Sequence, residues 1–406
     1  MKGTEPETFH FAEYVSPGHP DRLADAIAEA FVKRGMQVID PSGVVAACGG
    51  GYWADRSLVA IEVAIHDDHV FLDGRYAYEY DEEATIEQHE KEFAKDVLGI
   101  VHKVYQDAGY GSEWYPDPQQ LKVHNTICFE NLEDGEAEFR EYSDDQNLVI
   151  GYAEPTPETN CLPPAHFVAN RLGRALVEWR KGHAGTYGPD FKVLPCLRRV
   201  GSGSKVSWQW ERLTLSVQHK TRTFFEQQYG DLLPILEDTL QSLEQETGLT
   251  GLASSFSIDH LLLNGAGDFC QGGPEADNGL SGKKLVVDHY GPDVPIGGGA
   301  ICGKDPHKID KAGALRARQL AKRLAIQHQK PARVRLAWSP GDKEPFLIEA
   351  ALETEGIWQY LNPGQLPPSN WFKIETIFQD LKLSKVDWPQ VVLDGYFADP
   401  HHPWEQ

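Results

Sequence analysis

Hydrophobic and polar positions repeat along this chain with two different periods. The segment LADAIAEAFVKRG places Leu23, Ile27 and Phe31 on one helical face, and Gly35 is a natural helix end. In SLVAIEVAI, at residues 57–65, apolar positions instead recur every second residue, as in a strand with one covered face. Because such segments alternate along the chain, we predict a mixed α+β fold.

The same two patterns predict most of the remaining elements. Strands are expected in QLKVHNTICF, KVSWQWERLTLSVQH, FSIDHLLLN, KKLVVDHY, RVRLAWS and PFLIEAALE. Helices are expected at residues 85–108, 163–181, 230–247, 306–329 and 371–381. Pro- and Gly-rich joints lie at 151–164, 182–189 and 291–299, and the first and last are candidates for mobile active-site loops.

Composition narrows the class of protein. The 406 residues, 41% of them hydrophobic, are enough for about two or three domains. A net charge of −23 argues against nucleic acid and anionic lipid as partners, so any anion site must be a local group of cations. No signal peptide or membrane span is visible, and the six scattered cysteines never form C-x-x-C, which predicts a cytoplasmic protein with reduced thiols.

The stretch GGGAICGKDPHKID raises the question of a phosphate site. Residues 298–304 match the P-loop pattern G-x-x-x-x-G-K, but Asp305 replaces the Ser or Thr that would bind Mg²⁺. We expect Asp305 to cap the next helix and Pro306 to be its first residue, which places Lys304 before the helix rather than inside it. A P-loop is therefore rejected, but the glycines, the helix N-terminus, Lys304 and Lys308 still suit a polyphosphate. A Gly-rich turn with solvated lysines is the plain alternative for this stretch alone.

A second candidate stretch is VSPGHPDRLADAI near the N-terminus. A loop here presents His19, Asp21 and Arg22 just before a helix. His19 and Arg22 could bind phosphate oxygens, and Asp21 could bind Mg²⁺. A capped helix start with Asp21 as the N-cap is the plain alternative.

A third stretch, LLLNGAGDFCQGGPEADNGLSGKKLVVDHYG, is rich in glycine between two predicted strands. So many glycines suggest backbone packed against a ligand, with Phe269, Asp277, Lys283 and Lys284 among them. Phe269 suits either a hydrophobic core or a platform for a base.

Taken together, these stretches resemble the S-adenosylmethionine synthase (methionine adenosyltransferase) family. GHPDR is similar to the family's GHPDK. The segment 264–322 follows N-x-x-G-x-F, GGPxxDxGLxGxK, VDxYG and GGGAxxGKDPxKxD in order, and GYFADPHHPWE is similar to GHFG…PWE. The resemblance runs from about Ser16 to the end and is patchy in the middle. It implies three structurally similar α/β subdomains with mixed sheets and pseudo-threefold symmetry, built from residues 1–17 and 161–270, 18–128 and 271–305, and 129–160 and 306–406.

The resemblance also implies a reaction. In this family the methionine sulfur attacks C5′ of ATP and displaces triphosphate, which is hydrolysed to phosphate and pyrophosphate. It further implies two Mg²⁺ ions per site and a homodimer with sites at the interface, while a tetramer is left open. Two rivals remain: a catalytically silent relative that binds ATP or triphosphate and regulates a partner, and an unrelated phosphotransferase.

Motif matches carry the family's roles onto individual residues. The implied catalytic residues are His19, Lys192, Lys304 and Lys308; those for ATP or triphosphate are His19, Arg22, Phe269, Lys283, Lys284, Lys304 and Lys308; those for methionine are Glu62, Glu130, Asp145, Asp190 and Asp277; and those for Mg²⁺ are Asp21 and Asp310.

Some of these matches have alternatives. Asp145 lies in SDDQN, which resembles the family's GDQG, whereas Asp190 and Lys192 lie in YGPDFKV, which resembles PDxK. An insertion, LPCLRRVGSGS, is expected after Lys192, so the pair at residues 204–205 is a rival anchor. Glu62 could be an ordinary exposed strand residue, and the charges of YGPDFKV could simply be solvated.

Four positions depart from the family pattern. Arg22 replaces a Lys, Lys283 replaces an Arg, and Glu130 stands where the gating-loop Gln is expected. Gly49 stands where the family has a Glu that helps bind K⁺, which puts activation by K⁺ in doubt. These changes fit a divergent branch with an altered choice of methionine analogue.

Overall fold

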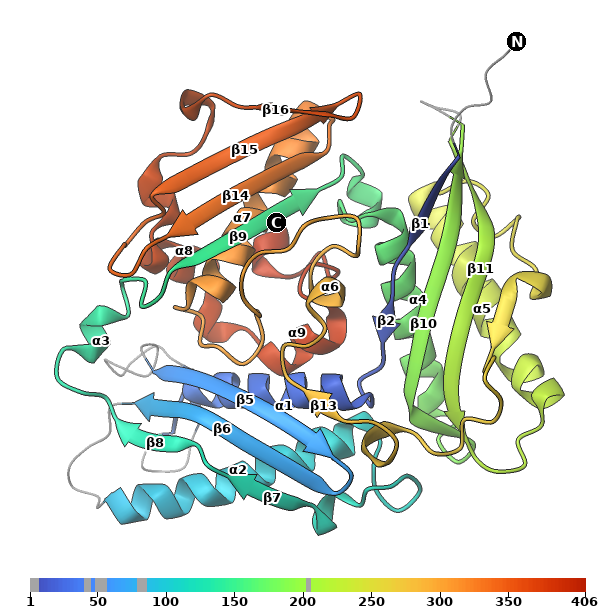
Figure 1. The fold of residues 1–406 in the computed structure, drawn as a ribbon, viewed down its shortest axis with the longest axis horizontal. Helices are drawn as coiled ribbons and strands as arrows, with labels where there is room; N and C mark the ends of the chain where they lie inside the picture. The colour runs from blue at the N-terminus through green and yellow to red at the C-terminus, as the bar shows by residue number, and fades with distance from the viewer. Residues whose placement is uncertain (1–6, 40–44, 48–56, 79–85, 202–205) are drawn as a thin grey trace.

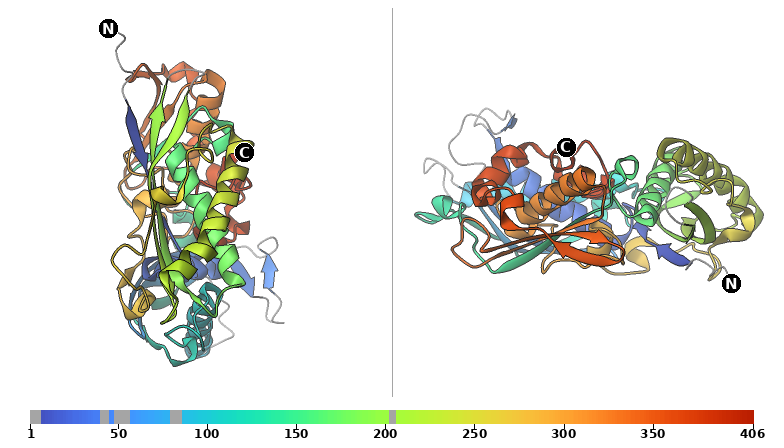
Figure 2. Two further views of the ribbon diagram at one scale, coloured as in Figure 1. Left: turned by 90° about the vertical axis from the view of Figure 1, so that its right-hand side faces the viewer. Right: turned by 90° about the horizontal axis from the view of Figure 1, so that it is seen from above.

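The chain folds around three multi-stranded sheets, each covered on one face by helices (Figure 1). The computed structural model describes residues 7–39, 45–47, 57–78, 86–201 and 206–406. Seen edge-on in Figure 2, the molecule is a flattened body in which helices gather on one side and bare sheet faces on the other. Within these described ranges, no helix is long and apolar enough to cross a membrane.

The first sheet has the order β1-β10-β11-β12, with β2 also paired to β10. Its strands are β1 (Thr8–Phe11), β2 (Tyr14–Val15), β10 (Tyr187–Val200), β11 (Ser207–His219) and β12 (Leu261–Leu263), and α4 (Pro164–Lys181) and α5 (Phe225–Thr247) cover it. The sheet is mixed because β12 runs parallel to β11. The segment expected to be an insertion after Lys192 is ordered, since residues 194–200 continue β10 and pair with β11 up to Val200 opposite Ser207.

The second sheet has the order β13-β5-β6-β7, with β8 also paired to β6. Its strands are β5 (Leu58–His66), β6 (His69–Tyr78), β7 (Lys122–Asn125), β8 (Cys128–Asn131) and β13 (Gly279–Leu280), and α1 (Pro20–Gly35) and α2 (Ile86–Ala108) cover it. β7 and β8 run parallel to β6, so this sheet is also mixed. The predicted inner face of α1 is confirmed, because Leu23, Ile27 and Phe31 are fully buried.

The third sheet, β16-β15-β14-β9, is antiparallel throughout. Its strands are β9 (Asn147–Ala153), β14 (Ala332–Trp338), β15 (Leu347–Thr354) and β16 (Ile357–Tyr360), and α7 (Ile309–His328) and α8 (Ile374–Asp380) cover it. Gly151 lets β9 approach α7 closely, since a Cβ there would lie 2.1 Å from the Ala317 carbonyl oxygen. The smaller elements are α3 (Glu136–Phe139), α6 (Leu285–Asp288), α9 (Trp388–Asp394) and the pair β3 (Gln37–Ile39) and β4 (Val45–Ala47).

Two predicted elements are wrong. KKLVVDHY is not a strand, because Leu285–Asp288 form the short helix α6. Arg22 pairs with Asp288, and the His289 ring bonds to the Leu285 carbonyl, so buried polar contacts outweigh the strand preference of the valines. The helix expected at 371–381 is split into a 3-10 turn, Ser369–Phe372, and α8, because Lys373 between them has an extended backbone.

Candidate functional site

The first cluster of polar side chains forms where α1 begins. His19 is the N-cap, and its Nδ1 accepts a hydrogen bond from the Asp21 backbone N–H at 3.1 Å. The alternative with Asp21 as the cap is therefore wrong. The Asp21 carboxylate instead contacts residues of the glycine-rich segment. It accepts from the Leu280 N–H at 3.0 Å and pairs with Lys284 Nζ at 3.1 Å and Lys283 Nζ at 3.5 Å.

Electrostatics sets the charge states in this cluster. Burial opposes ionisation of Asp21, but the Leu280 N–H and Lys284 outweigh it and hold its pKa below the ordinary value. Burial, aided by the charge of Lys192, lowers the pKa of His19 to about 3. His19 is therefore neutral at pH 7, and because Nδ1 accepts a bond, Nε2 carries the proton and can donate to an anion.

A second wall of this cluster comes from β10 and the glycine-rich segment after β12. Asp190 is buried and accepts from the Gly273 N–H at 2.8 Å. Burial raises its pKa to about 6, against the Gly273 N–H and the nearby Lys192, while Asp277 raises it further. The half-buried ring of Phe269 packs on Gly272, where a Cβ would lie 2.9 Å from the ring.

The second cluster surrounds the turn before α7. The expected helix cap at Asp305 is wrong, since α7 begins at Ile309 with Lys308 in the N-cap position. Asp305 is fully buried and accepts instead from the Val59 N–H at 3.1 Å and from Arg140 Nη2 at 2.5 Å. Burial opposes its ionisation, but Arg140 holds the pKa of Asp305 well below its usual value. Because the helix starts well after the Gly-Lys pair, the rejection of a P-loop is confirmed.

The partly exposed members of this cluster are paired acids and bases. Lys304 Nζ lies 2.8 Å from Asp310 Oδ1, and Lys308 pairs with Asp144, next to Asp145. Gly299 covers Asp310 so closely that a Cβ there would lie 1.5 Å from the carboxylate oxygen. Gly299 therefore leaves room for the Asp310 carboxylate and Lys304 to meet.

Both clusters attach to the same edge of β5. Leu280, which bonds to Asp21, pairs with Ala64, and Lys304 forms a bridge with Ala60. Ala60 and Ala64 are four positions apart along the strand, which corresponds to about 13 Å. One strand edge thus carries two groups of lysines, each with its carboxylate.

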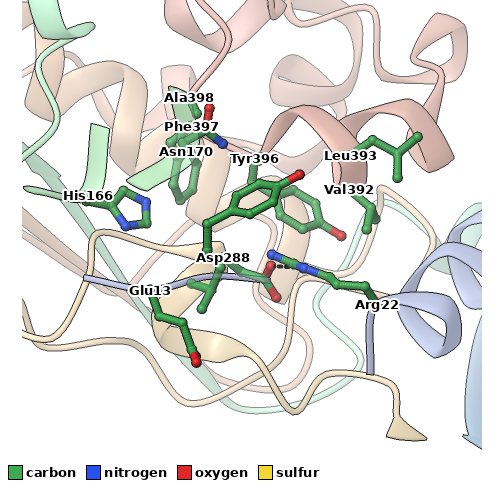
Figure 3. Close-up of a pocket in the computed structure, with 13 residues that line it drawn as sticks. Glu13, Arg22, His166, Asn170, Asp288, Val392, Leu393, Tyr396, Phe397 and Ala398 are labelled. Atoms are coloured by element: carbon green, nitrogen blue, oxygen red, sulfur yellow. Dashed lines mark hydrogen bonds and ion pairs between the residues drawn. The ribbon is translucent and has the colours of Figure 1, made fainter. Parts of the chain in front are cut away.

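Several predicted residues lie apart from these clusters. Arg22 points into a small buried pocket, where it bonds to Asp288 and Asp25 (Figure 3). Glu62 is on the exposed face of β5, and Glu130 pairs with Arg75 at 3.0 Å. Gly49 and the rival pair at 204–205 lie outside the described residues.

The structure therefore groups most, but not all, of the candidates. The first cluster contains His19, Asp21, Asp190, Lys192, Phe269, Asp277, Lys283 and Lys284, and the second contains Lys304, Lys308 and Asp310. Asp145 is only the chain neighbour of Asp144, which pairs with Lys308. Sequence reasoning missed Arg140 and Asp144, although Asp144 stands at the first glycine of GDQG and was visible as a departure. Among the described residues no group of three or more His, Cys, Asp or Glu could hold a metal ion, so substrate oxygens or water would have to complete any site built on Asp21 or Asp310.

Comparison with known proteins shows which family this chain resembles. The family described as S-adenosylmethionine synthetase, C-terminal domain, matches residues 271–406. The S-adenosylmethionine synthase of Thermus thermophilus is 30% identical over 97% of this chain and 95% of its own length. The chain belongs to the S-adenosylmethionine synthase family. The Paracoccus denitrificans family member is 31% identical over 84% of this chain and 79% of its own length.

The fold agrees with the family. The solved structure titled as an unusual S-adenosylmethionine synthetase from Campylobacter jejuni has a TM-score of 0.76 to this chain, covers 98% of it and 97% of its own chain, and is 21% identical. The predicted fold class is thereby confirmed. At about 30% identity a divergent member of the family also fits.

Proposed function

We propose that the chain is an active S-adenosylmethionine synthase that joins methionine to the adenosyl group of ATP and releases phosphate and pyrophosphate. The observation that carries this proposal is the edge of β5, where Lys283 and Lys284 stand at one anchor and Lys304 and Lys308 at the other. A highly charged polyphosphate is the ligand such a row of cations suits.

For this reaction the protein has to align the two substrates and stabilise the negative charge of the leaving triphosphate. A thioether sulfur is already nucleophilic, so no strong base is needed when it attacks C5′ of ATP. The four lysines and the Nε2–H of His19 would stabilise the departing triphosphate. Phe269 would stack on adenine, and Asp190 and Asp277, with Glu62 from the sheet face, would bind the amino group of methionine.

The residues present fit Mg²⁺. Asp21 Oδ2 is buried without a well-aligned hydrogen bond, although Lys284 Nζ lies 3.1 Å away, and Asp310 is largely covered by Gly299. Mg²⁺ prefers oxygen ligands and commonly uses one or two carboxylates together with substrate phosphates. When bound, two such ions would neutralise the charge that develops on the triphosphate.

A homodimer is part of the proposal. The bare sheet faces carry exposed apolar side chains, among them Phe11, Leu194 and Phe71. Lys192 and Glu62 lie on the same faces, so a second copy packed there would complete the site. Light scattering after size-exclusion chromatography should give a mass near twice the 45.3 kDa of the chain.

The product assay tests the function. The chain should convert methionine and ATP, with Mg²⁺, to S-adenosylmethionine, phosphate and pyrophosphate. No product with ATP still bound would favour the silent relative, and release of ADP would favour a phosphotransferase. The assay with and without K⁺, and with bulkier S-alkyl homocysteines, tests the altered site.

Two variants sharpen the test. Asp21→Asn or Lys304→Ala should abolish turnover while each variant still folds and unfolds in a single cooperative thermal transition. Asp387→Asn and Lys33→Ala are matched controls, because they remove the same charges from a surface pair 2.8 Å apart between α1 and the α9 start. Full activity in both site variants would contradict the roles proposed for Asp21 and Lys304.

A further inference from the structure

Four charged side chains form a continuous series of contacts beside Lys304, where the second cluster attaches to β5. Lys308 pairs with Asp144, and Asp144 Oδ2 lies 3.9 Å from Arg140 Nη1. Arg140 Nη2 in turn lies 2.5 Å from Asp305. Two acids and two bases thus balance, so Lys308 presents no net positive charge to a ligand while Asp144 stays in place.

These four side chains differ in their exposure to solvent. The Asp305 side chain is fully buried and that of Arg140 is 5% exposed, whereas those of Lys308 and Asp144 are 19% and 30% exposed. The backbone before Asp144 is held by the Ser143 N–H on the Asp342 carbonyl and by the Gly341 N–H on the Ser143 carbonyl, both at 2.8 Å. The carboxylate can therefore change partners by side-chain rotation alone, between a fixed Arg140 and a movable Lys308.

By the resemblance of its segment to the family motif, Asp144 stands where a glycine is expected. It is the first residue of DDQN, at the position of the first glycine in the motif GDQG. A glycine there has no side chain to offer Lys308.

We propose that Asp144 is an internal competitor of the substrate's phosphate groups, which holds Lys308 while the site is empty and turns to Arg140 when a polyphosphate takes its place. The proposal rests on the proposed function, because it assigns Lys308 to the triphosphate. Its consequence is weaker binding of ATP and of the polyphosphate products than the lysines alone would give, and faster release of those products.

The experiment uses inorganic tripolyphosphate with Mg²⁺ as the probe, measured by titration calorimetry on the full chain. Asp144→Asn and Asp144→Gly should each bind the probe about twofold to fivefold more tightly than wild type, which is the range expected for one partly exposed ion pair. The KM for ATP should fall by a similar factor. Asp134→Asn, in an exposed turn of the same segment, removes one negative charge without touching Lys308 and should bind like wild type.

A double-variant cycle separates competition from a general charge effect. In a Lys308→Ala background, Asp144→Asn should no longer tighten binding, because the contested cation is gone. Equal affinity of wild type and both Asp144 variants overturns the competitor while leaving the proposed function intact, as does an equal gain in Asp134→Asn. A wild-type chain that binds no tripolyphosphate at all overturns both.

Discussion

Gly299→Ala is the smallest change that should disable the second cluster without unfolding the chain. A Cβ at this position would lie 1.5 Å from Asp310 Oδ1, 2.7 Å from its Cγ and 3.3 Å from Lys304 Nζ. These atoms belong to side chains, so the backbone can stay where it is while the Asp310 carboxylate retreats by about 1.5 Å. The change therefore moves a proposed Mg²⁺ ligand and its lysine partner together.

The two consequences differ greatly in size. The Lys304–Asp310 pair is partly exposed, with side chains 31% and 13% accessible, so its loss should cost about 0–1 kcal/mol of the free energy of unfolding. Misplacing a group that aligns the reactants by about 1 Å can lower turnover by about 100-fold. We therefore expect Gly299→Ala to retain nearly normal stability in urea and to lose about two orders of magnitude in kcat in the product assay.

Gly298→Ala is the matched control. The nearest atoms to a Cβ at Gly298 are 3.9 Å away, which is ordinary van der Waals contact, so this variant should keep its activity. If Gly299→Ala is as active as Gly298→Ala, the placement of Asp310 does not matter for turnover and its role as a metal ligand is refuted. If both variants fail alike, the loop conformation rather than the carboxylate explains the loss.

Two further predictions concern the support of the fold. Glu405 is buried and receives Arg318 Nε at 2.8 Å and Lys322 Nζ at 3.0 Å, so Glu405→Gln should lower the free energy of unfolding in urea by about 3–5 kcal/mol, whereas Glu178→Gln, on an exposed surface pair, should change it little. Burial lowers the pKa of His166 to about 4 (Figure 3). Its unfolded value is near 6.5, so the stability it contributes is present above that pH and is lost as the pH falls toward 4, by up to about 3 kcal/mol. The difference in unfolding free energy between pH 7 and pH 4.5 should therefore be smaller in His166→Gln, and an unchanged difference would contradict the assignment.

Local periodicity was enough to predict the elements that bury one clear face. Residues of β5 alternate between core and surface as the pattern requires, and both α1 and β5 lie where they were expected. The predicted face of α1 is buried, but so are polar residues on its other faces, such as Asp25 and Glu29. Periodicity failed at α6. Its two valines favour a strand, whereas the ion pair of Asp288 with Arg22 favours the short helix that is observed. That partner lies 266 residues away, so no local pattern could reveal it.

The joint predicted at 151–164 contains more regular structure and more contacts than its composition indicates. Its composition is typical of a loop, but Gly151 belongs to β9, and Arg318 donates to the carbonyl groups of Tyr152, Asn160 and Cys161. The segment is held by a buried cation from α7. Proline and glycine predict where a regular element breaks, and they carry no information on what the irregular backbone contacts.

For the site, sequence motifs predicted which residues matter better than how they are arranged. Lys304 and Asp310 were both expected to bind the substrate or its metal, yet in the chain they bind each other. Asp305 was expected to act through a helix cap and instead anchors the turn to Arg140. Residue types follow from the chemistry of the ligand, whereas pairings in the free chain depend on which opposite charge is nearest, and that is set by the tertiary fold.

These pairings explain how a chain of charge −23 can offer a site to a polyphosphate. The buried pairs Asp305–Arg140 and Glu29–Lys311 hold the turn and the first residues of α7 in place. The exposed lysines around them are neutralised by carboxylates that face solvent on one side. A polyphosphate can replace an exposed partner at little cost, because partly exposed pairs are weak, whereas the buried pairs cannot be exchanged without leaving a charge unpaired. The same arrangement that avoids like-charge repulsion in the empty site therefore separates a rigid frame from lysines that are ready to change partners.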